Sequence, residues 1–266
     1  MQIEIIIIGI LAGLLAGMFG IGGGIVIVPS LVLVLGWNMH LATGTSLATL
    51  LLPTGFLALL QYKRANLLHL KVAAFIALGI VLGNIAGSTL ALNAATPILK
   101  QLFGVFQIII GIKYFRLFDF FKKKKTDNNN NITPNINTEN FSNPNIIKNY
   151  ILILVGVSAG ILSGLFGIGG GVIITTALIS IYQIHPKQAV AISLASMFLP
   201  VGIGGVLLYN QYSYVNIWAA IIIAVGIEVG SAVSARIAIL VKADLVKRLF
   251  GLLLIIIGLY FVLHNQ

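Results

Sequence analysis

The chain has 266 residues, of which 59% are hydrophobic and 8% charged, with a mean hydropathy of +1.06 and a net charge of +10. So few polar side chains cannot cover a soluble globule of this length, which excludes a soluble protein and indicates a membrane protein. Because the chain has no cysteine, disulfides, thiolate metal sites and cysteine nucleophiles are excluded. In a membrane protein the position of the positive charges indicates orientation in the bilayer, so the net charge does not indicate nucleic-acid binding.

The first half holds five apolar segments, most of them long enough to cross a bilayer core of roughly 30 Å, which takes about 20 residues. The first segment carries only Glu4 and lacks a basic region or a cleavage pattern, so we expect it to be retained rather than removed as a signal peptide. The second follows a glycine cluster and is short, which predicts a broken or re-entrant helix. The segments are 1–18, 24–36, 41–62, 68–92 and 95–118.

At 122–149 the composition changes sharply to lysine, asparagine and other polar residues. Such a segment buries too little apolar surface to offset the entropy of ordering it, so we predict a disordered linker. The chain therefore divides into a first transmembrane repeat at 1–121, the linker at 122–149 and a second transmembrane repeat at 150–266. The second repeat has apolar segments at 150–165, 171–183, 189–209, 217–240 and 245–263.

The two halves are copies of each other. GMFGIGGGIVIVP in the first half corresponds to GLFGIGGGVIITT in the second, and aligning Gly20 with Gly167 sets an offset of 147 residues. This offset runs without a gap through both halves, so the protein is an internal duplication. It pairs Ser46 with Ser193, Pro53 with Pro200, Tyr62 with Tyr209 and Gly83 with Gly230.

Charge predicts the orientation of the repeats. The linker carries four lysines at 122–125, and the positive-inside rule places it in the cytoplasm. Counting membrane crossings from the linker then places the basic loop at 63–71 in the cytoplasm and the neutral loop at 210–216 outside. These two loops are aligned with each other, so the two repeats have opposite orientations. Of 16 Lys and Arg residues, only Lys100 lies on the external side. We therefore predict an all-α polytopic protein of the cell membrane, with two inverted-topology repeats of about five hydrophobic helices each and both termini external.

We call residues 20–24 and 167–171 the first and second glycine knots. Four glycines in five residues weaken a helix by about 1 kcal/mol each, so each knot predicts a break followed by a new helix start. Unpaired amides and the positive dipole end at such a start attract an anion, whereas the alternative is helix packing alone. The candidate substrate-binding residues are these glycines and nearby hydroxyls: Gly22, Gly23, Gly24, Thr43, Thr45, Ser46, Gly169, Gly170, Gly171, Ser193 and Ser196.

Two polar residues interrupt the long apolar helices of the repeats. Glu228 is costly in a membrane and is therefore a candidate for proton coupling, with a structural hydrogen-bonding role as the alternative. Asn84 is a second candidate. The glycines at 79, 83 and 87 repeat every four residues, which is typical of a packing face. The four histidines are scattered along the chain, so we expect no metal site.

The doubled GxFGIGGG, followed in the first repeat by VPxL at 28–31 and ATGTS at 42–46, resembles the sulfite exporter TauE/SafE family. The resemblance covers nearly the whole chain outside the linker. It implies an exporter of small sulfur-containing anions, such as sulfite or sulfoacetate. The second repeat departs from the pattern, with IITTAL in place of VPxL and AIS in place of GTS, which makes the expected site asymmetric.

Three functions follow from these patterns. The first is a secondary transporter working by alternating access, with a small anionic substrate, the lipid bilayer around it and no cofactor or nucleic-acid partner. The second is a non-transporting membrane scaffold or assembly factor, in which the glycines only pack helices. The third, an intramembrane enzyme, lacks a nucleophile with a base at depth, so we expect no catalytic residues.

Overall fold

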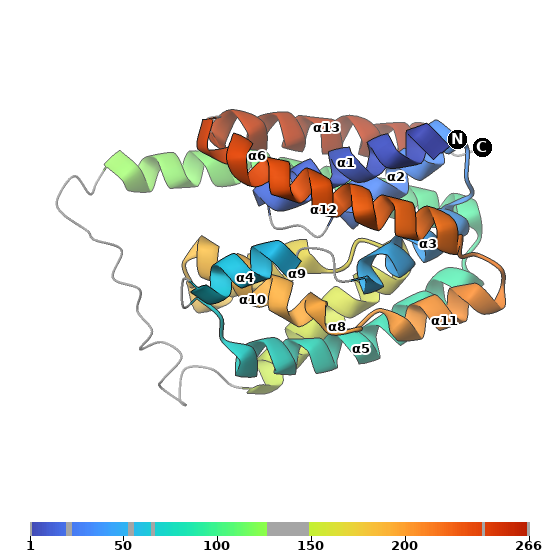
Figure 1. Ribbon diagram of the computed structural model, residues 1–266, viewed down its shortest axis with the longest axis horizontal. Coiled ribbons are helices and arrows are strands. Elements are labelled where there is room, and N and C mark those ends of the chain that lie inside the picture. The colour runs from blue at the N-terminus through green and yellow to red at the C-terminus, as the bar shows by residue number, and fades with distance from the viewer. Residues whose placement is uncertain are drawn as a thin grey trace.

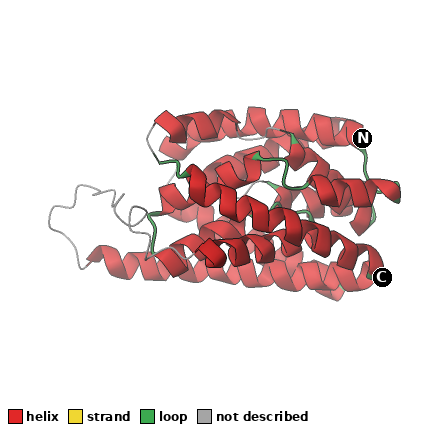
Figure 2. Cartoon of the chain, turned by 90° about the horizontal axis from the view of Figure 1, so that it is seen from below, coloured by secondary structure: helices red, strands yellow, loops and turns green. Residues whose placement is uncertain are grey.

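The computed structural model describes residues 2–19, 23–52, 56–64, 67–126, 149–240 and 243–264. Within these ranges every regular element is a helix, and Figure 2 shows helices joined by loops with no strand among them. The all-α fold class predicted from the sequence is confirmed.

Among the described residues, six helices belong to the first repeat and six equivalent helices belong to the second. Each helix of the second repeat begins 147 residues after its counterpart, so the alignment of the glycine knots also aligns the secondary structure. The first repeat has α1 (Gln2–Phe19), α2 (Gly24–Leu35), α3 (Met39–Leu51), α4 (Phe56–Arg64), α5 (Leu70–Asn93) and α6 (Thr96–Thr126). The second has α8 (Asn149–Phe166), α9 (Gly171–Tyr182), α10 (Pro186–Phe198), α11 (Ile203–Gln211), α12 (Ile217–Leu240) and α13 (Ala243–Leu263).

Membrane-spanning helices are present in both repeats. Three described helices, α5, α8 and the first part of α6, are long and apolar enough to cross a bilayer, and the bent pair α10–α11 adds a fourth if it is counted as one span. The predicted linker lies between α6 and α8. α6 extends to Thr126, into the range assigned to the linker, and residues 127–148 lie outside the described residues.

The third apolar segment of each repeat forms two helices, where the sequence analysis expected one continuous span at 41–62 and at 189–209. α10 and α11 meet at a bend of 48°. Pro200 cannot donate a backbone hydrogen bond, and its ring disfavours helical backbone at the preceding residue. Leu199 is accordingly extended, with φ −69° and ψ 149°. Leu52, which precedes Pro53 in the sequence, has nearly the same conformation, with φ −69° and ψ 151°.

Glycine seams join helices from different repeats. Along α5, a Cβ on Gly79 would overlap the carbonyl oxygen of Ile153, and one on Gly87 would overlap that of Ile161, so α5 and α8 run parallel in direct backbone contact. α1 and α12 pair in the same way, with Gly9 against Ile223 and Gly13 against Ile227. The packing face expected at residues 79, 83 and 87 is therefore present, and it faces α8.

The repeats are intertwined, because the first helix of each packs against the fifth helix of the other. The sixth helices also meet: Gly104 of α6 lies against Gly258 of α13 and Gly111 lies against Gly251, so this pair is antiparallel. Figure 1 shows α1, α12, α6 and α13 along one side, α5, α8 and α11 along the other, and α3, α9 and α10 between them. Both chain ends lie at one end of the molecule, opposite the end of α6 and the start of α8.

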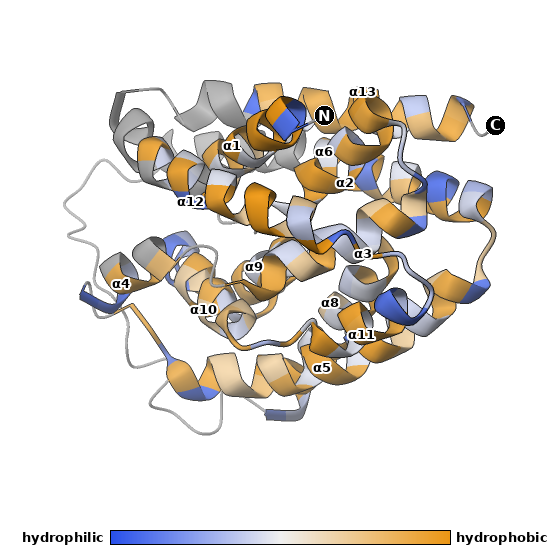
Figure 3. Ribbon diagram, turned by 45° about the vertical axis from the view of Figure 1, so that its right-hand side comes forward, coloured by the Kyte–Doolittle hydropathy of each residue, from blue (hydrophilic) through white to orange (hydrophobic). Residues whose placement is uncertain are grey.

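The outer surface is apolar, as a lipid-facing surface must be. Trp218 is 78% exposed, and Leu78, Leu82 and Ile256 are also more than half exposed. Figure 3 shows that hydrophobic residues predominate along the long helices. The interior is mostly apolar as well, and it encloses a smaller set of polar residues that includes Thr43, Ser46, Asn84 and Ser193, each with no exposed surface. Apolar side chains on the outside of long helices agree with a multi-pass membrane protein.

The two repeats differ at Pro29, inside α2. A proline has no N–H, so the carbonyl oxygen of Ile25, four residues earlier, lacks its usual helical donor. Gln107 of α6 supplies one, since its Nε2 lies 3.2 Å from that oxygen in a fully buried position. The aligned residues of the second repeat are Thr176, which has an N–H, and Leu254, which cannot donate. Proline with glutamine in one repeat and threonine with leucine in the other are thus two solutions to the same backbone requirement.

Gln107→Leu is therefore expected to destabilise the protein by about 1 kcal/mol, because it leaves the buried Ile25 carbonyl unpaired. In a Pro29→Thr background the same change is expected to cost less, since residue 29 then donates the missing N–H. Thermal unfolding of the two single variants and the double variant in detergent measures this coupling. Gln101→Leu, at an exposed position of α6, is the matched control. Equal costs of Gln107→Leu in both backgrounds would contradict the pairing.

Candidate functional site

The two repeats meet at their glycine knots. Gly24, the first residue of α2, packs directly on the second knot: a Cβ at this position would overlap the carbonyl oxygen of Gly167 and lie 2.8 Å from the Cα of Ile168. A Cβ on Gly167 would in turn lie 2.9 Å from the carbonyl oxygen of Thr43 in α3. The start of one short helix is therefore held against the glycine knot of the opposite repeat, at the centre of the molecule.

The second knot needs glycine for its backbone conformation. Gly167, Gly169 and Gly170 have φ values of 69°, 76° and 76°, which side chains disfavour, and Gly23 of the first knot has φ 79°. Gly167 donates its N–H to the Ser163 carbonyl at the end of α8, and Gly170 begins α9. Gly23 and Gly170, which precede α2 and α9, provide no side-chain cap, so both helices begin at buried positions with a positive dipole end and no side-chain acceptor for their first amide groups.

Three of the predicted hydroxyl groups lie at the knots. Ser46 Oγ donates to the carbonyl oxygen of Gly167 at 2.7 Å, which ties α3 to the opposite repeat. Ser193 Oγ donates to the Gly171 carbonyl at 3.3 Å. Thr43, beside Gly167, is fully buried, and its Oγ1 has no hydrogen-bond partner among the described residues. A buried donor of this kind is available to a ligand or a water molecule.

The other predicted hydroxyls make contacts away from the knots. Thr45 Oγ1 accepts a hydrogen bond from the N–H of Asn216, just before α12, and Ser196 Oγ donates to Ile192 within its own helix. These two residues hold the backbone and are not directed toward the knot glycines. Gly22, another predicted site residue, lies outside the described residues.

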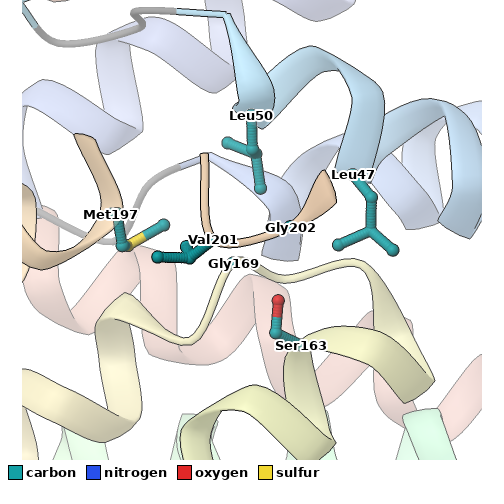
Figure 4. A pocket seen from close by; sticks show the side chains of 7 residues that line it. All are labelled: Leu47, Leu50, Ser163, Gly169, Met197, Val201 and Gly202. Atoms are coloured by element: carbon teal, nitrogen blue, oxygen red, sulfur yellow. The ribbon is translucent and has the colours of Figure 1, made fainter. Parts of the chain in front are cut away.

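A small cavity adjoins the second knot, with a volume of about 10 Å³. This is room for about one water molecule. As Figure 4 shows, it lies between α3, the end of α8, the second knot and the break between α10 and α11. Its lining is mostly apolar, with one hydroxyl, and consists of Leu47, Leu50, Ser163, Gly169, Met197, Val201 and Gly202.

Both repeats contribute to the lining of the cavity, and one aligned pair of residues is part of it. Leu50 and Met197 are aligned residues, 147 positions apart, and both line it. Ser163 is the polar residue that the sequence analysis missed, because its aligned residue is Ala16 and no repeat symmetry marks it. The signal in the sequence is the position of Ser163 one helical turn before Gly167. In the structure the carbonyl of Ser163 accepts the hydrogen bond from Gly167 at the end of α8, and its side chain is 2% exposed.

Asn84 stabilises the helix that follows the break. Its Oδ1 accepts a hydrogen bond of 2.9 Å from the N–H of Gly205, in the first turn of α11, so a side chain of α5 caps α11 from outside. Tyr209, later in α11, donates from its hydroxyl to the Gly164 carbonyl at 3.0 Å. These two bonds fix α11 against α5 and α8. The Oγ of Ser88, one turn after Asn84, is buried without a partner among the described residues.

Glu228 lies on α12, where it is half-buried and its carbonyl accepts a hydrogen bond from Ser231 Oγ at 3.0 Å. The preceding residue, Ile227, faces the first knot: its Cδ1 would lie 3.6 Å from a Cβ on Gly23. Glu228 is therefore one residue away from the side chain that packs beside the start of α2. The coupling role given to Glu228 and Asn84 stays a prediction.

Comparison with known proteins identifies the chain. A family model described as sulfite exporter TauE/SafE matches residues 5–261, which include both knots and both repeats. The chain belongs to the sulfite exporter TauE/SafE family. The resemblance drawn from the glycine and VPxL motifs is thus confirmed.

Relatives in this family are named as transporters. The chain is 28% identical to a probable membrane transporter protein of Methanocaldococcus jannaschii, over 97% of this chain and 94% of the relative. It is 27% identical to the probable membrane transporter protein YunE of Bacillus subtilis, over 96% of this chain and 94% of YunE. No solved structure matches the chain. The protein is accordingly a TauE/SafE-type membrane transporter.

The cap on α11 gives a prediction for this TauE/SafE protein. Asn84→Ala is expected to lower the free energy of unfolding by about 1–2 kcal/mol, because Gly205 loses its acceptor. Ser88→Ala removes an equally buried hydroxyl that has no partner in the described part of the chain, so it is expected to be neutral or slightly stabilising. Thermal unfolding in detergent compares the two. If Ser88→Ala lowered the free energy of unfolding as much as Asn84→Ala, the loss would come from removing a buried polar group and not from removing the cap on α11.

Proposed function

We propose that this protein is a secondary transporter, and not an enzyme, that exports small sulfur-containing anions such as sulfite or sulfoacetate by alternating access. The observation that carries the proposal is the cavity at the second knot, lined by aligned residues of both repeats and by the break between α10 and α11. Substrate sites at a repeat interface beside broken helices are the usual plan of secondary transporters. The family description supplies the sulfur anion.

An inverted arrangement of the repeats is part of this proposal. It is supported by helix directions: α8 runs parallel to α5, α1 runs parallel to α12, and the equivalent helices α6 and α13 run antiparallel. Inversion would bring the two knots together from opposite faces of the membrane. The basic residues of the linker support a cytoplasmic position for it and an external position for both chain ends.

The chemistry at the knots suits an anion. α2 and α9 begin at Gly24 and Gly171 without side-chain caps, so amide groups and positive dipole ends are directed toward the region between the repeats. Ser163 contributes a hydroxyl at the cavity. The backbone of Thr43 lies beside Gly167, and its buried hydroxyl has no partner among the described residues. Neutral donors would bind an anion without the help of a buried cation. They would bind it less tightly than a charged site, which favours release of the anion on the other side of the membrane.

The cavity holds about one water molecule, so a sulfur anion can enter only when the helices move apart. The break at 199–202 is the natural hinge, because it joins two helices bent by 48° and contains Gly202, which lines the cavity. We therefore interpret this conformation as a closed one. Access to either side would alternate as the short broken helices of one repeat move against the other.

Helix packing alone, as in a membrane scaffold, accounts for the glycines of α5 and α8 but not for all features of the second knot. A Cβ at Gly79 would strike backbone, as packing requires. Gly169 has a positive φ and packs on the side chains of Leu50 and Met197, so its backbone conformation and packing explain the glycine. The feature that favours the transporter over the scaffold is the cavity at the repeat interface, which Gly169 lines.

The direct test is flux in proteoliposomes containing the purified chain, with sulfite, thiosulfate, sulfoacetate and sulfate offered separately. We expect sulfite to move, and Ser163→Ala to slow it by about tenfold, the cost of one lost hydrogen bond to a charged ligand. Ser158→Ala is the matched control: Ser158 is also on α8, but its hydroxyl donates to the Val155 carbonyl of its own helix. Its flux should equal that of the wild type.

Transport of these anions is refuted if none of the four moves and none raises the thermal stability of the protein. Flux that is unchanged in Ser163→Ala would leave transport standing and remove the cavity from the pathway. The Ser158→Ala control separates these outcomes from a general loss of α8 stability.

Proton coupling is tested at Glu228. Gln has nearly the same shape as Glu and can still form hydrogen bonds, but it cannot bind and release a proton, so Glu228→Gln is expected to weaken the dependence of sulfite flux on a pH gradient. Flux is measured with and without the gradient for both proteins. The same dependence in both would exclude Glu228 from coupling and favour its structural role.

A further inference from the structure

A buried tyrosine lies between the cavity and the end of the molecule that carries both chain ends. α3 and α11, which come from different repeats, run antiparallel: a Cβ on Gly202, just before α11, would lie 4.0 Å from the Leu47 carbonyl oxygen, and Tyr209 packs on Gly44. Leu47 and Gly202 line the cavity, so Gly44 and Tyr209 are the next contact along the two helices. Figure 1 shows the loop that follows α11 at the same end as both chain ends.

Tyr209 fills the space between the helices. Its side chain is 0% exposed, and a Cβ on Gly44 would lie 2.9 Å from the Cβ of Tyr209, so a larger residue than glycine would push the ring out. The hydroxyl of Tyr209 donates to the Gly164 carbonyl of α8 at 3.0 Å. The ring therefore holds α11 against α3 of the first repeat and against α8 of its own repeat.

The loop after α11 adds a second layer over Tyr209. The N–H of Tyr214 donates to the Tyr209 carbonyl at 2.9 Å, and a Cβ on Gly44 would overlap the carbonyl oxygen of Tyr214. The ring of Tyr214 stacks on His40, in the first turn of α3, with ring centroids 5.2 Å apart. His40 is 6% exposed. The path between α3 and α11 is thus closed first by Tyr209 and then by the pair of stacked rings.

The aligned path in the other half of the fold is closed less tightly. Tyr62 of α4 is aligned with Tyr209 but is only half-buried, and the exposed Lys187 takes the position of the buried histidine. His69 still contacts Gln188 of α10 on that side, with 2.8 Å between their side-chain nitrogens. A tyrosine that served only the core would be expected to be equally buried in both copies of a duplicated fold. The difference indicates that the conformation is sealed beside Tyr209 and looser beside Tyr62.

We infer that Tyr209 is a gate residue, which closes the path from the cavity to the outside in this conformation, and that Tyr62 closes the aligned path to the cytoplasm when the external one opens. The inference rests on the proposed function and names the residues that alternate in it. The break at 199–202 allows α11 to tilt away from α3. Tyr209 would then leave Gly44, while Tyr62 would pack on Ala191, which is aligned with Gly44.

The test measures access to the cavity from outside. The full chain has no cysteine of its own, so Leu47→Cys places a single thiol at the cavity, where Leu47 is 2% exposed. A membrane-impermeant methanethiosulfonate reagent added to intact cells is expected to label it slowly. Adding Tyr209→Ala is expected to raise the labelling rate about tenfold or more, because the closed state loses the ring and its hydrogen bond and the open state gains population.

Two controls separate the gate from a general loosening of the fold. Leu207→Ala, on the lipid-facing side of the same helix where Leu207 is 58% exposed, should leave the labelling rate unchanged. Tyr62→Ala should speed labelling from the cytoplasmic side, measured in inside-out vesicles, and not from the outside. If Tyr209→Ala fails to fold, Tyr209→Phe keeps the ring, removes only the hydroxyl donor, and is expected to speed external labelling by a smaller factor.

The gate is overturned if folded Tyr209 variants are labelled from outside no faster than the parent protein, or if Leu207→Ala or Tyr62→Ala accelerates external labelling equally. Because labelling requires no substrate, its outcome is independent of the sulfur anion. Absence of sulfite flux in a protein whose labelling responds to Tyr209 as expected would count against the proposed substrate and leave the gate in place. Normal sulfite flux with labelling that does not respond to Tyr209 would leave the transporter and remove the gate.

Discussion

Contact between backbones, possible only where a side chain is missing, is the constraint on which this structure depends. α5 lies on α8, and α1 on α12, through glycines whose Cβ positions are filled by carbonyl groups of the partner helix. The same contact joins Gly24 to the second knot. In a membrane, where lipid is as apolar as leucine, such close packing provides association that the hydrophobic effect cannot. It also places the uncapped starts of α2 and α9 at the junction of the repeats.

The differences between the repeats have local physical causes. Pro29 and Gln107 correspond to Thr176 and Leu254, so the departure from VPxL is explained by a backbone carbonyl that needs a donor, without reference to a ligand. Asn84, which caps α11, corresponds to Ser231, and Ser163 at the cavity corresponds to Ala16. The duplicated fold is therefore symmetric in its helices and asymmetric in its polar groups. On the proposed function, Ser163 marks the side of the cavity that contacts the anion.

Much of the fold could be predicted from sequence, because helix starts at Gly24, Gly171 and Ile217 follow from glycine punctuation and apolar length. The breaks after Leu51 and Phe198 were not foreseen, since apolar runs continue across Pro53 and Pro200 and hydrophobicity alone does not reveal a bend. Within the candidate site, Ser46, Ser193 and Thr43 lie at the knots as expected. Thr45 and Ser196 bond to backbone elsewhere, because the direction of a hydroxyl depends on tertiary neighbours that a motif does not specify.

The proposed opposite orientation of the two repeats, which brings their knots together within the membrane, is the premise of the transport mechanism. Because the chain has no cysteine, single cysteines at Asn93, Asn210 and Lys71, all exposed, can be labelled with a membrane-impermeant maleimide added to intact cells. Opposite orientations predict labelling at residues 93 and 210, and labelling at residue 71 only after permeabilisation. Labelling at 93 with protection at 210 would mean that the repeats run in the same direction, and would contradict the account.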